Sequence, residues 1–393
     1  MNPIRLAVIG IGNIGTLHLT NIEKLPSKLH LTAVCDIIPE KAQRAAEHYG
    51  CAAYTDAEIL LKDGVADAVI IATPHYAHTT IGIAALDAGR HVLVEKPISV
   101  HKADAERLIT AYERARARGE TPTFAAMFNQ RTDPRYRKVR QLVQQGELGA
   151  LMRVNWIITN WFRTEAYYAS SDWRATWAGE GGGVLLNQCV HNLDLFQWIC
   201  GMPSKVWGFC GIGKHHEIEV EDEVTAYLEY PNGATGVFVT STGEAPGTNR
   251  LELHGERGRV VLEDGLGPGR DLTFTRTEVS VPEFNRTSNS AYDQPPAWQV
   301  TFPISGSGGQ HAEVLENFAD AILSGVPLVA PAEEGLHSVE LANAMLYSTL
   351  TGEPVTLPLD GVAFERELHK LIATSSYIKT TRDDIHVDIQ ASF

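Results

Sequence analysis

Cysteine is scarce in this sequence, and none of it stands in a metal-binding pattern. The five cysteines are odd in number, and no two of them form a C-x-x-C pair. A disulfide framework and a zinc knuckle are therefore not expected. We predict a protein of the reducing cytoplasm without a metal site.

Long apolar runs and an excess of positive charge are lacking as well. No stretch comes near the roughly 18 uninterrupted apolar residues of a membrane span, and the first residues do not resemble a secretory signal. The 33 Lys and Arg are outnumbered by 48 Asp and Glu, which gives a formal net charge of −15. Because this charge repels polyanions, neither nucleic acid nor an anionic membrane is expected as a partner.

The composition is that of an ordinary folded protein, with 44% hydrophobic and 21% charged residues, and the 393 residues suffice for two domains. In the first third, short apolar runs alternate with helical patterns. Strands are predicted over residues 5–10, 29–36, 68–73, 91–95 and 124–128, and helices over 40–49, 79–88, 103–118 and 134–145. This alternation predicts an α/β domain, a doubly wound parallel sheet of the Rossmann type, over residues 1–125.

From residue 151 onward, apolar and polar residues alternate instead. The alternation covers residues 153–157, 224–230, 236–240 and 250–255, with a turn at Pro231-Asn232-Gly233. It predicts a large open, mainly antiparallel sheet with one covered face. Helices are expected over 312–323 and 334–350, packing on or beside this sheet, and a loop is expected over 278–298. Residues 126–393 are thus predicted to form an α+β domain.

A glycine motif follows the first predicted strand, and it consists of Gly10, Ile11, Gly12, Asn13, Ile14 and Gly15. Glycines at this spacing permit a tight turn and close approach of the backbone to a pyrophosphate. Asp36 stands at the end of the second predicted strand, where a carboxylate accepts hydrogen bonds from ribose hydroxyls and repels a 2′-phosphate. Ile37 offers no positive charge, so NAD is favoured over NADP. The alternative is a glycine turn of another Rossmann-like domain, such as a methyltransferase.

Two further segments carry candidate catalytic groups. Glu95-Lys96-Pro97 ends a parallel strand at the edge where such sheets bind ligands, and a lysine there can stabilise a developing alkoxide. Gly181-Gly182-Gly183 precedes an apolar segment in which Asn187, His191 and Asp194 share one face of a predicted helix, and an imidazole there could act as a general base. The alternatives are a solvated lysine and a histidine that is hydrogen-bonded within its domain.

Three other clusters of polar or aromatic residues are less specific. His215-His216-Glu217 and residues 219–223 could suggest metal ligands, but alternation along a strand favours a solvated acidic edge. Trp161-Phe162-Arg163 and Trp173-Arg174 suit sugars and phosphates, because aromatic faces and guanidinium groups bind both. Ordinary packing is the alternative for each of these aromatic residues.

Taken together, these motifs resemble the Gfo/Idh/MocA family of glucose-fructose oxidoreductase and inositol dehydrogenase. The resemblance rests on the glycine motif, Thr73-Pro74-x-x-x-His78, Glu95-Lys96-Pro97 and the glycines before His191. It implies an N-terminal Rossmann domain, a C-terminal domain whose open sheet builds homodimers or homotetramers, and a nicotinamide between the two.

The resemblance also implies roles for individual residues. Lys96 would contact the reacting hydroxyl and His191 would accept its proton. Trp173 and Arg174 match a pair near cofactor and substrate, while Thr73, Pro74 and His78 match residues beside the nicotinamide. Asn187 departs from the usual aspartate of the family, and an amide cannot raise the basicity of His191 as a carboxylate would.

The leading hypothesis is an NAD-dependent dehydrogenase that interconverts a secondary hydroxyl and a ketone on a sugar, glycoside or cyclitol. Lys96, Arg163, Asn187 and His191 are predicted to bind the substrate. Two alternatives stay open: cleavage of a glycoside by transient oxidation with retained NAD, and a non-catalytic regulator that binds a dinucleotide or sugar.

Overall fold

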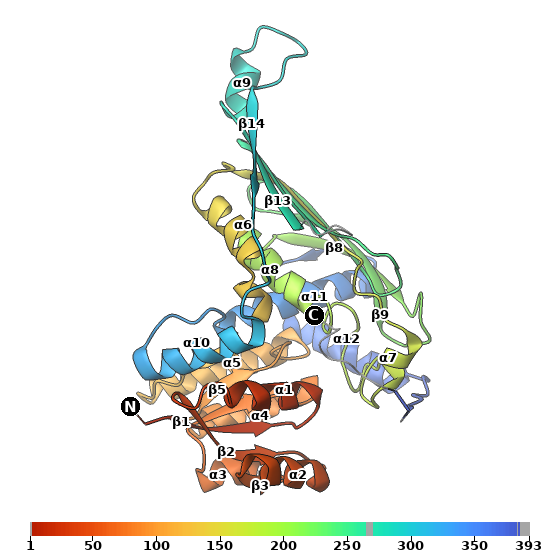
Figure 1. Ribbon diagram of the computed structural model, residues 1–393. Coiled ribbons are helices and arrows are strands. Elements are labelled where there is room, and N and C mark those ends of the chain that lie inside the picture. The colour runs from red at the N-terminus through yellow and green to blue at the C-terminus, as the bar shows by residue number, and fades with distance from the viewer. Residues whose placement is uncertain (1, 265–269, 383, 386–393) are drawn as a thin grey trace.

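The computed structural model describes residues 2–264, 270–382 and 384–385, which contain two β-sheets with their helices (Figure 1). The first sheet has six strands in the order β3-β2-β1-β4-β5-β6, and each neighbouring pair is parallel. The strands are β1 Ile4–Ile9, β2 Leu29–Cys35, β3 Ala52–Tyr54, β4 Ala68–Ile71, β5 His91–Val94 and β6 Phe124–Ala126. The predicted doubly wound parallel sheet is confirmed.

The helices of this region alternate with the strands, as the sequence pattern predicts. They are α1 Asn13–Ile22, α2 Pro39–Tyr49, α3 Ala57–Asp63, α4 His75–Asp87 and α5 Lys102–Ala117, followed by the 3-10 helix η1 Asn129–Thr132. α2 begins at a proline and ends at Gly50 with φ of 68°, where a glycine carries no steric penalty. The sequence pattern does not predict β3 and α3, because three and seven residues are too short for a clear period.

The second sheet has nine strands in the order β14-β13-β12-β11-β7-β10-β9-β8-β15. They are β7 Leu151–Ile158, β8 Lys205–Ile212, β9 Glu221–Glu229, β10 Thr235–Ser241, β11 Asn249–Gly255, β12 Gly258–Asp264, β13 Arg270–Thr277, β14 Ala297–Phe302 and β15 Val355–Thr356. β7 and β10 pair in parallel, and the other neighbouring strands are antiparallel. The mainly antiparallel sheet is therefore confirmed.

Helices cover one face of this sheet (Figure 1). The helices of this region are α6 Pro134–Gln144, α7 Glu165–Ala169, α8 Val190–Cys200, α9 Val281–Thr287, α10 Gln310–Ser324, α11 Gly335–Thr351 and α12 Gly361–Thr374, with the 3-10 helix η2 Ala332–Glu334. Trp156 of β7 and Phe238 of β10 are fully buried, and the ring of Phe196 from α8 lies 6.4 and 5.8 Å from theirs. The alternating pattern thus buries one side of each strand under α8.

Two parts of the C-terminal half differ from the prediction. Residues 278–298 are expected to be a loop, but they include α9 and the start of β14, and Figure 1 shows these elements extending away from the rest of the molecule. α10 returns to the first sheet, where Val314, Leu315 and Phe318 pack in the core that β1 forms. The boundary at residue 125 stays a prediction. Among the described residues, no helix is long and apolar enough to cross a membrane.

Candidate active site

The glycine turn between β1 and α1 combines tight backbone packing with open space. A Cβ on Gly10, whose φ is +95°, would lie 2.5 Å from the carbonyl oxygen of Ala72, and one on Gly15 would lie 1.9 Å from that of Gly10. A Cβ on Gly12 would meet nothing within 4 Å. Gly12 also precedes α1 without a side-chain cap, so the first N–H groups of the helix, from Asn13 onward, can bind an anion.

Asp36 lies beside this turn at the end of β2. One carboxylate oxygen accepts a hydrogen bond from the N–H of Ile11 at 2.8 Å, and the other accepts from the N–H of Ile38 at 2.9 Å. Ile37 is 88% exposed. The open face of Gly12, the uncapped helix and the fixed carboxylate fit the pyrophosphate and ribose of a dinucleotide.

Lys96 follows β5 and is held between the two halves of the chain. Its Nζ donates to the backbone carbonyl of Asn187 at 2.9 Å. Burial lowers the pKa of Lys96 to about 8, with Glu95 acting in the opposite direction and Arg174 adding to the decrease. Near neutral pH the ammonium is therefore protonated, yet it can lose its proton at a small cost.

The carboxylate of Glu95 lies between the backbone of Lys96 and a cluster of histidines, and its Oε2 accepts from the N–H of Lys96 at 3.2 Å. Its Oε1 lies 2.8 Å from Nε2 of His18, which is fully buried, and the ring of His311 lies 6.1 Å from that of His18. Burial alone would raise the pKa of Glu95, but the His18 hydrogen bond and nearby cationic groups lower it to about 2. Glu95 is thus ionised, and its structural role is to connect the Lys96 turn to His18.

The Thr73-Pro74 segment lies against the Lys96 turn. The ring nitrogens of His78 lie 2.7 Å from the carbonyl oxygen of Pro97 and 2.8 Å from that of Thr73. His78 therefore joins the two segments and leaves no nitrogen for a ligand. The hydroxyl of Thr73 is buried and has no hydrogen-bond partner among the described residues, so it can bind a polar group of a ligand.

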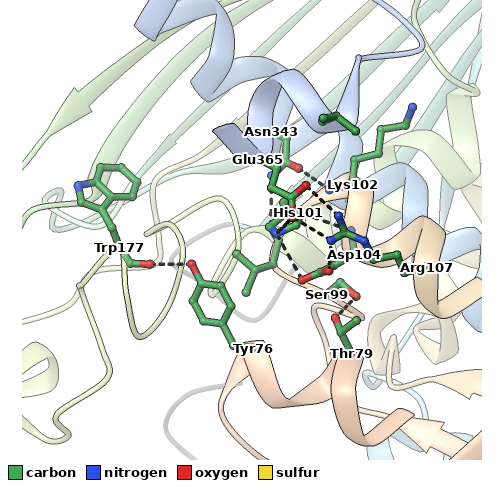
Figure 2. Close-up of polar contacts among 12 residues, drawn as sticks. Tyr76, Thr79, Ser99, His101, Lys102, Asp104, Arg107, Trp177, Asn343 and Glu365 are labelled. Atoms are coloured by element: carbon green, nitrogen blue, oxygen red, sulfur yellow. Dashed lines mark hydrogen bonds and ion pairs between the residues drawn. The ribbon is translucent and has the colours of Figure 1, made fainter. Parts of the chain in front are cut away.

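A network of polar contacts fixes the chain that follows Pro97 (Figure 2). Ser99 bonds to Thr79 at 2.7 Å, and the N–H of Lys102 donates to Asn343 at 2.8 Å. Figure 2 also shows the hydroxyl of Tyr76 donating to the carbonyl of Trp177. The Lys96 turn is therefore tied to α4 and to the second half of the chain.

One group of residues in Figure 2 resembles a cation site. Ligand atoms of His101, Asp104 and Glu365 lie within 4.8 Å of one another. The Arg107 guanidinium, however, contacts Asp104 at 2.5 Å and Glu365 at 2.8 Å. Because this cation already forms ion pairs with both carboxylates, the group is an ion-pair cluster joining α5 to α12.

The glycines before His191 serve close packing rather than flexibility. A Cβ on Gly181 would lie 2.0 Å from a methyl carbon of Val100, and one on Gly183 would lie 2.0 Å from the carbonyl oxygen of Glu221. The segment is thus pressed between the Lys96 side of the molecule and β9.

The predicted helix in this segment begins later than expected. α8 starts at Val190, and Asn187 lies in the turns before it. The expectation that Asn187, His191 and Asp194 share a helix face is therefore wrong. Asp194 instead forms a buried ion pair with Arg131 at 2.5 Å, which is a structural role.

His191 is buried and unbonded. The residue is only 3% exposed, so water does not replace a missing partner. Even so, neither ring nitrogen has a hydrogen-bond partner among the described residues. Burial, together with the charge of Lys96, holds the pKa of His191 well below its usual value. A neutral imidazole with a free nitrogen can accept a proton from a bound hydroxyl.

Glu180 is a buried carboxylate that the motif analysis did not single out. It accepts hydrogen bonds from the Asn187 side-chain amide and, at 2.6 Å, from the N–H of Ala175. Burial raises its pKa, while the charges of Arg174 and Lys96 act against that increase. Its position directly before Gly181 is the only signal the sequence offers.

Two arginines and two aromatic residues complete the site. Arg174 donates to the hydroxyl of Tyr167 at 2.6 Å and lies 4.6 Å from the ring centre of Trp173. Arg163 lies 5.1 Å from the ring centre of Tyr167. Both arginine charges disfavour the protonated form of Lys96 and so lower its pKa. Arg163 and Arg174 therefore lie near the lysine, and Trp173 lies beside Arg174.

The predicted solvated acidic edge is wrong for Glu221 and Asp222, which are 1% and 0% exposed. Glu221 accepts hydrogen bonds from the N–H groups of Gly183 and Leu185 at 2.8 and 3.2 Å. Asp222 accepts from three successive N–H groups of residues 214–216. Both carboxylates stabilise turns by replacing water around backbone donors.

Two protein-family models match the sequence. "Oxidoreductase family, NAD-binding Rossmann fold" covers residues 4–119, and "GFO/IDH/MocA C-terminal domain" covers residues 136–261. Together they span more than half of the chain. The protein belongs to the Gfo/Idh/MocA family. The chain is accordingly an NAD(P)-dependent oxidoreductase, and the Rossmann region is its NAD-binding part.

Relatives of this Gfo/Idh/MocA oxidoreductase span nearly its whole length. Myo-inositol 2-dehydrogenase of Thermotoga maritima is 26% identical over 352 residues, which make up 87% of this chain and 95% of that enzyme. The WlbA dehydrogenase of Bordetella pertussis, solved with NADH and UDP-GlcNAcA, is 26% identical with a TM-score of 0.75 and covers 91% of this chain and 100% of its own. Levoglucosan dehydrogenase, solved with NADH and L-sorbose, shares the fold with a TM-score of 0.73 at 21% identity, over 91% of this chain and 100% of its own.

Proposed function

We propose that the protein is a dehydrogenase that interconverts a secondary hydroxyl and a ketone on a sugar, glycoside or cyclitol. The observation that carries this proposal is the pairing of a half-buried ammonium, Lys96, with the neutral imidazole of His191, which is buried and has no hydrogen-bond partner among the described residues. The similarity to inositol and sugar dehydrogenases supports the substrate class.

Lys96 and His191 would have different roles at the reacting hydroxyl. The ammonium donates a hydrogen bond to the reacting oxygen and stabilises the negative charge that develops there. His191 accepts the hydroxyl proton, and the carbon–oxygen bond becomes a carbonyl. Bound NAD supplies the acceptor for the hydride that leaves the carbon. In the reductive direction, His191 returns the proton to the oxygen.

Other residues would hold the substrate beside this pair. Asn187 and Arg163 can bind neighbouring hydroxyls, and Trp173 with Arg174 can contact the sugar and the nicotinamide side of the cofactor. The buried hydroxyl of Thr73, which has no hydrogen-bond partner in the described part of the chain, can bind the same ligands. Because these groups are fixed by surrounding contacts, much of their contribution is orientation.

The cofactor preference is proposed to be NAD over NADP. The carboxylate of Asp36 is fixed by two backbone N–H groups and bears a charge that repels a 2′-phosphate. Ile37, the adjacent exposed residue, brings no positive charge that could offset this repulsion.

The open face of the nine-stranded sheet is proposed to bind a second copy of the chain, giving a homodimer or homotetramer. Trp207 and Phe209 of β8 and Tyr227 of β9 are 44%, 61% and 39% exposed, and Trp207 stands directly opposite Tyr227. Contiguous exposed apolar residues of this kind are typical of interfaces between subunits.

The test of the proposed reaction is the appearance of NADH when the purified protein meets NAD and a panel of sugars, glycosides and inositols. For the best substrate, Lys96→Ala should lower kcat by about 100-fold or more, because an electrostatic stabiliser of the oxyanion is lost. NAD binding, measured by calorimetry, should stay near the wild-type value. Turnover close to wild type in this variant would remove Lys96 from the mechanism.

A matched control is Lys102→Ala, since Lys102 follows the same turn but donates to the carbonyl of Leu359 and contacts Glu340. This change should lower stability with a much smaller effect on kcat. Cleavage of a glycoside without net NADH release would instead support transient oxidation with retained cofactor.

A further inference from the structure

The carboxylate of Glu180 lies at the centre of the contacts that shape the substrate side of the site. Glu180 is 2% exposed. One oxygen accepts from the amide nitrogen of Asn187, and the other accepts from the N–H of Ala175 at 2.6 Å. Its backbone carbonyl lies 3.2 Å from Nδ1 of His75 in α4. A single residue therefore links the Asn187 turn, the Trp173–Ala175 segment and α4.

The contact with Glu180 decides which way the Asn187 amide faces. The amide turns its N–H2 group toward Glu180, where a carboxylate oxygen accepts the hydrogen bond. The carbonyl oxygen of that amide then points away from the carboxylate. That oxygen makes no hydrogen bond with the described residues, so it can accept one, while the backbone carbonyl of the same residue holds Lys96.

The contact with Ala175 fixes a second part of the site. Ala175 has φ of 59°, a left-handed conformation that is uncommon for a residue with a side chain. Its N–H bond to Glu180 supports that conformation, directly after Trp173 and Arg174. The charge of Arg174 in turn acts on both Glu180 and Lys96.

We propose that Glu180 is a positioning residue, which orients Asn187 as an acceptor for a substrate hydroxyl and sets the conformation of the Trp173-Arg174 segment. This inference rests on the proposed dehydrogenase function and adds to it that the substrate bears a hydroxyl next to the reacting carbon, donated to Asn187. Glu180 and Asn187 act as one unit, in which the carboxylate fixes the direction of the amide.

The decisive variants are Glu180→Gln, Asn187→Asp and the double variant E180Q/N187D. A glutamine at position 180 has one acceptor for two donors, so it either breaks the Ala175 contact or allows the Asn187 amide to reverse. In the double variant, the amide nitrogen introduced at position 180 can donate to the carboxylate introduced at position 187, while the amide oxygen accepts from Ala175. The second carboxylate oxygen then faces the substrate as an acceptor.

We expect E180Q to raise the KM for the polyol by about 10-fold or more, the effect of one misdirected buried hydrogen bond. The dissociation constant of the polyol, measured by calorimetry with NADH present, should rise by the same factor, and that of NAD should stay within about twofold. N187D alone places two carboxylates in contact, so the pair should share a proton and kcat/KM should fall at higher pH. E180Q/N187D should recover most of the loss in KM.

The outcomes separate this inference from the proposed function. A wild-type protein that oxidises no polyol, glycoside or cyclitol overturns the function and this inference with it. If the wild type is active and E180Q keeps its KM, substrate affinity and pH profile, only the inference is wrong. It is equally wrong if E180Q/N187D is no better than E180Q, because a merely structural carboxylate would not be rescued by the exchange.

Discussion

We expect Asp36 and Ile37, on the cofactor side, to determine whether the protein prefers NAD or NADP. Asp36 is held by the N–H groups of Ile11 and Ile38, so its charge stays at the end of β2. Replacing Asp36 with Ser and Ile37 with Arg should remove the repulsion of a 2′-phosphate and supply a partner for it. We expect kcat/KM for NAD to fall by about 10-fold or more and that for NADP to rise similarly.

The measurement is kcat/KM with each cofactor at a fixed concentration of the best substrate. Ile59→Arg is the matched control, because Ile59 is equally apolar and 53% exposed but lies on α3. A wild-type protein that already uses NADP as well as NAD would contradict the role given to Asp36.

At the scale of residues, the sequence predicts candidates that lie in a short motif. Lys96 and His191 are such candidates, because a strand end and a glycine segment mark their positions, and their catalytic roles stay predictions. Glu180 escapes prediction, because its role depends on the turns between residues 181 and 189, and these turns have the same apolar spacing as a helix. His78 is predicted to lie near the cofactor, but its ring is used in joining Thr73 to Pro97.

Among the elements, β9 holds the glycine segment in place, because the buried side chain of its Glu221 accepts hydrogen bonds from the N–H groups of Gly183 and Leu185. Burial raises the pKa of Glu221 to about 7, whereas an unfolded glutamate titrates near a pKa of about 4.3. The folded state therefore binds the proton more tightly than the unfolded state. The contribution of Glu221 to the free energy of unfolding is therefore largest below a pH of about 4.3, and it falls as the pH rises from about 4.3 to about 7.

Glu221→Gln should remove this decline, since glutamine can accept from Gly183 and Leu185 without ionising. The variant should match the wild type near a pH of about 4.5 and exceed its free energy of unfolding by roughly 3 kcal/mol above a pH of about 7.5. Urea unfolding at a series of pH values measures the free energy of unfolding of the wild type and of the variant. Parallel stability curves for the two proteins would show that Glu221 does not titrate in this range.

Elements with a sustained period are predictable, and short or irregular ones are not. α2 has a proline at its start, a glycine at its end and a buried alanine face, so three independent signals agree. The start of β14 falls in a segment predicted as a loop, because the residues of this strand are exposed on both sides, which removes the alternation that marks a half-buried strand.

For the whole molecule, the sheet topology is predictable in part, because buried and half-buried strands have different patterns. The return of α10 to the first sheet is not, since Phe318 and its neighbours show only that the helix has an apolar face. Which surface covers that face depends on contacts between residues far apart in the sequence, such as Lys28 with Glu316 at 2.8 Å.

The exposed face of the second sheet leads to a prediction about assembly. Phe209 lies beside Trp207 on β8, with their rings 6.5 Å apart and nearly parallel. Phe209→Glu would place a charge in the proposed subunit interface, where burying it without a partner is costly. We expect the molar mass from light scattering to fall from that of an oligomer to 43.0 kDa, the mass of one chain.

Ile59→Glu provides the comparison, because it puts the same charge on an exposed apolar position of α3, outside the sheet. It should leave the molar mass unchanged. A wild-type protein that is monomeric at micromolar concentration, or a Phe209→Glu variant that stays oligomeric, would show that this face is not the interface. Since Phe209 lies on the face of the sheet opposite α8 and His191, dissociation should leave cofactor binding intact, which separates assembly from the chemistry of the site.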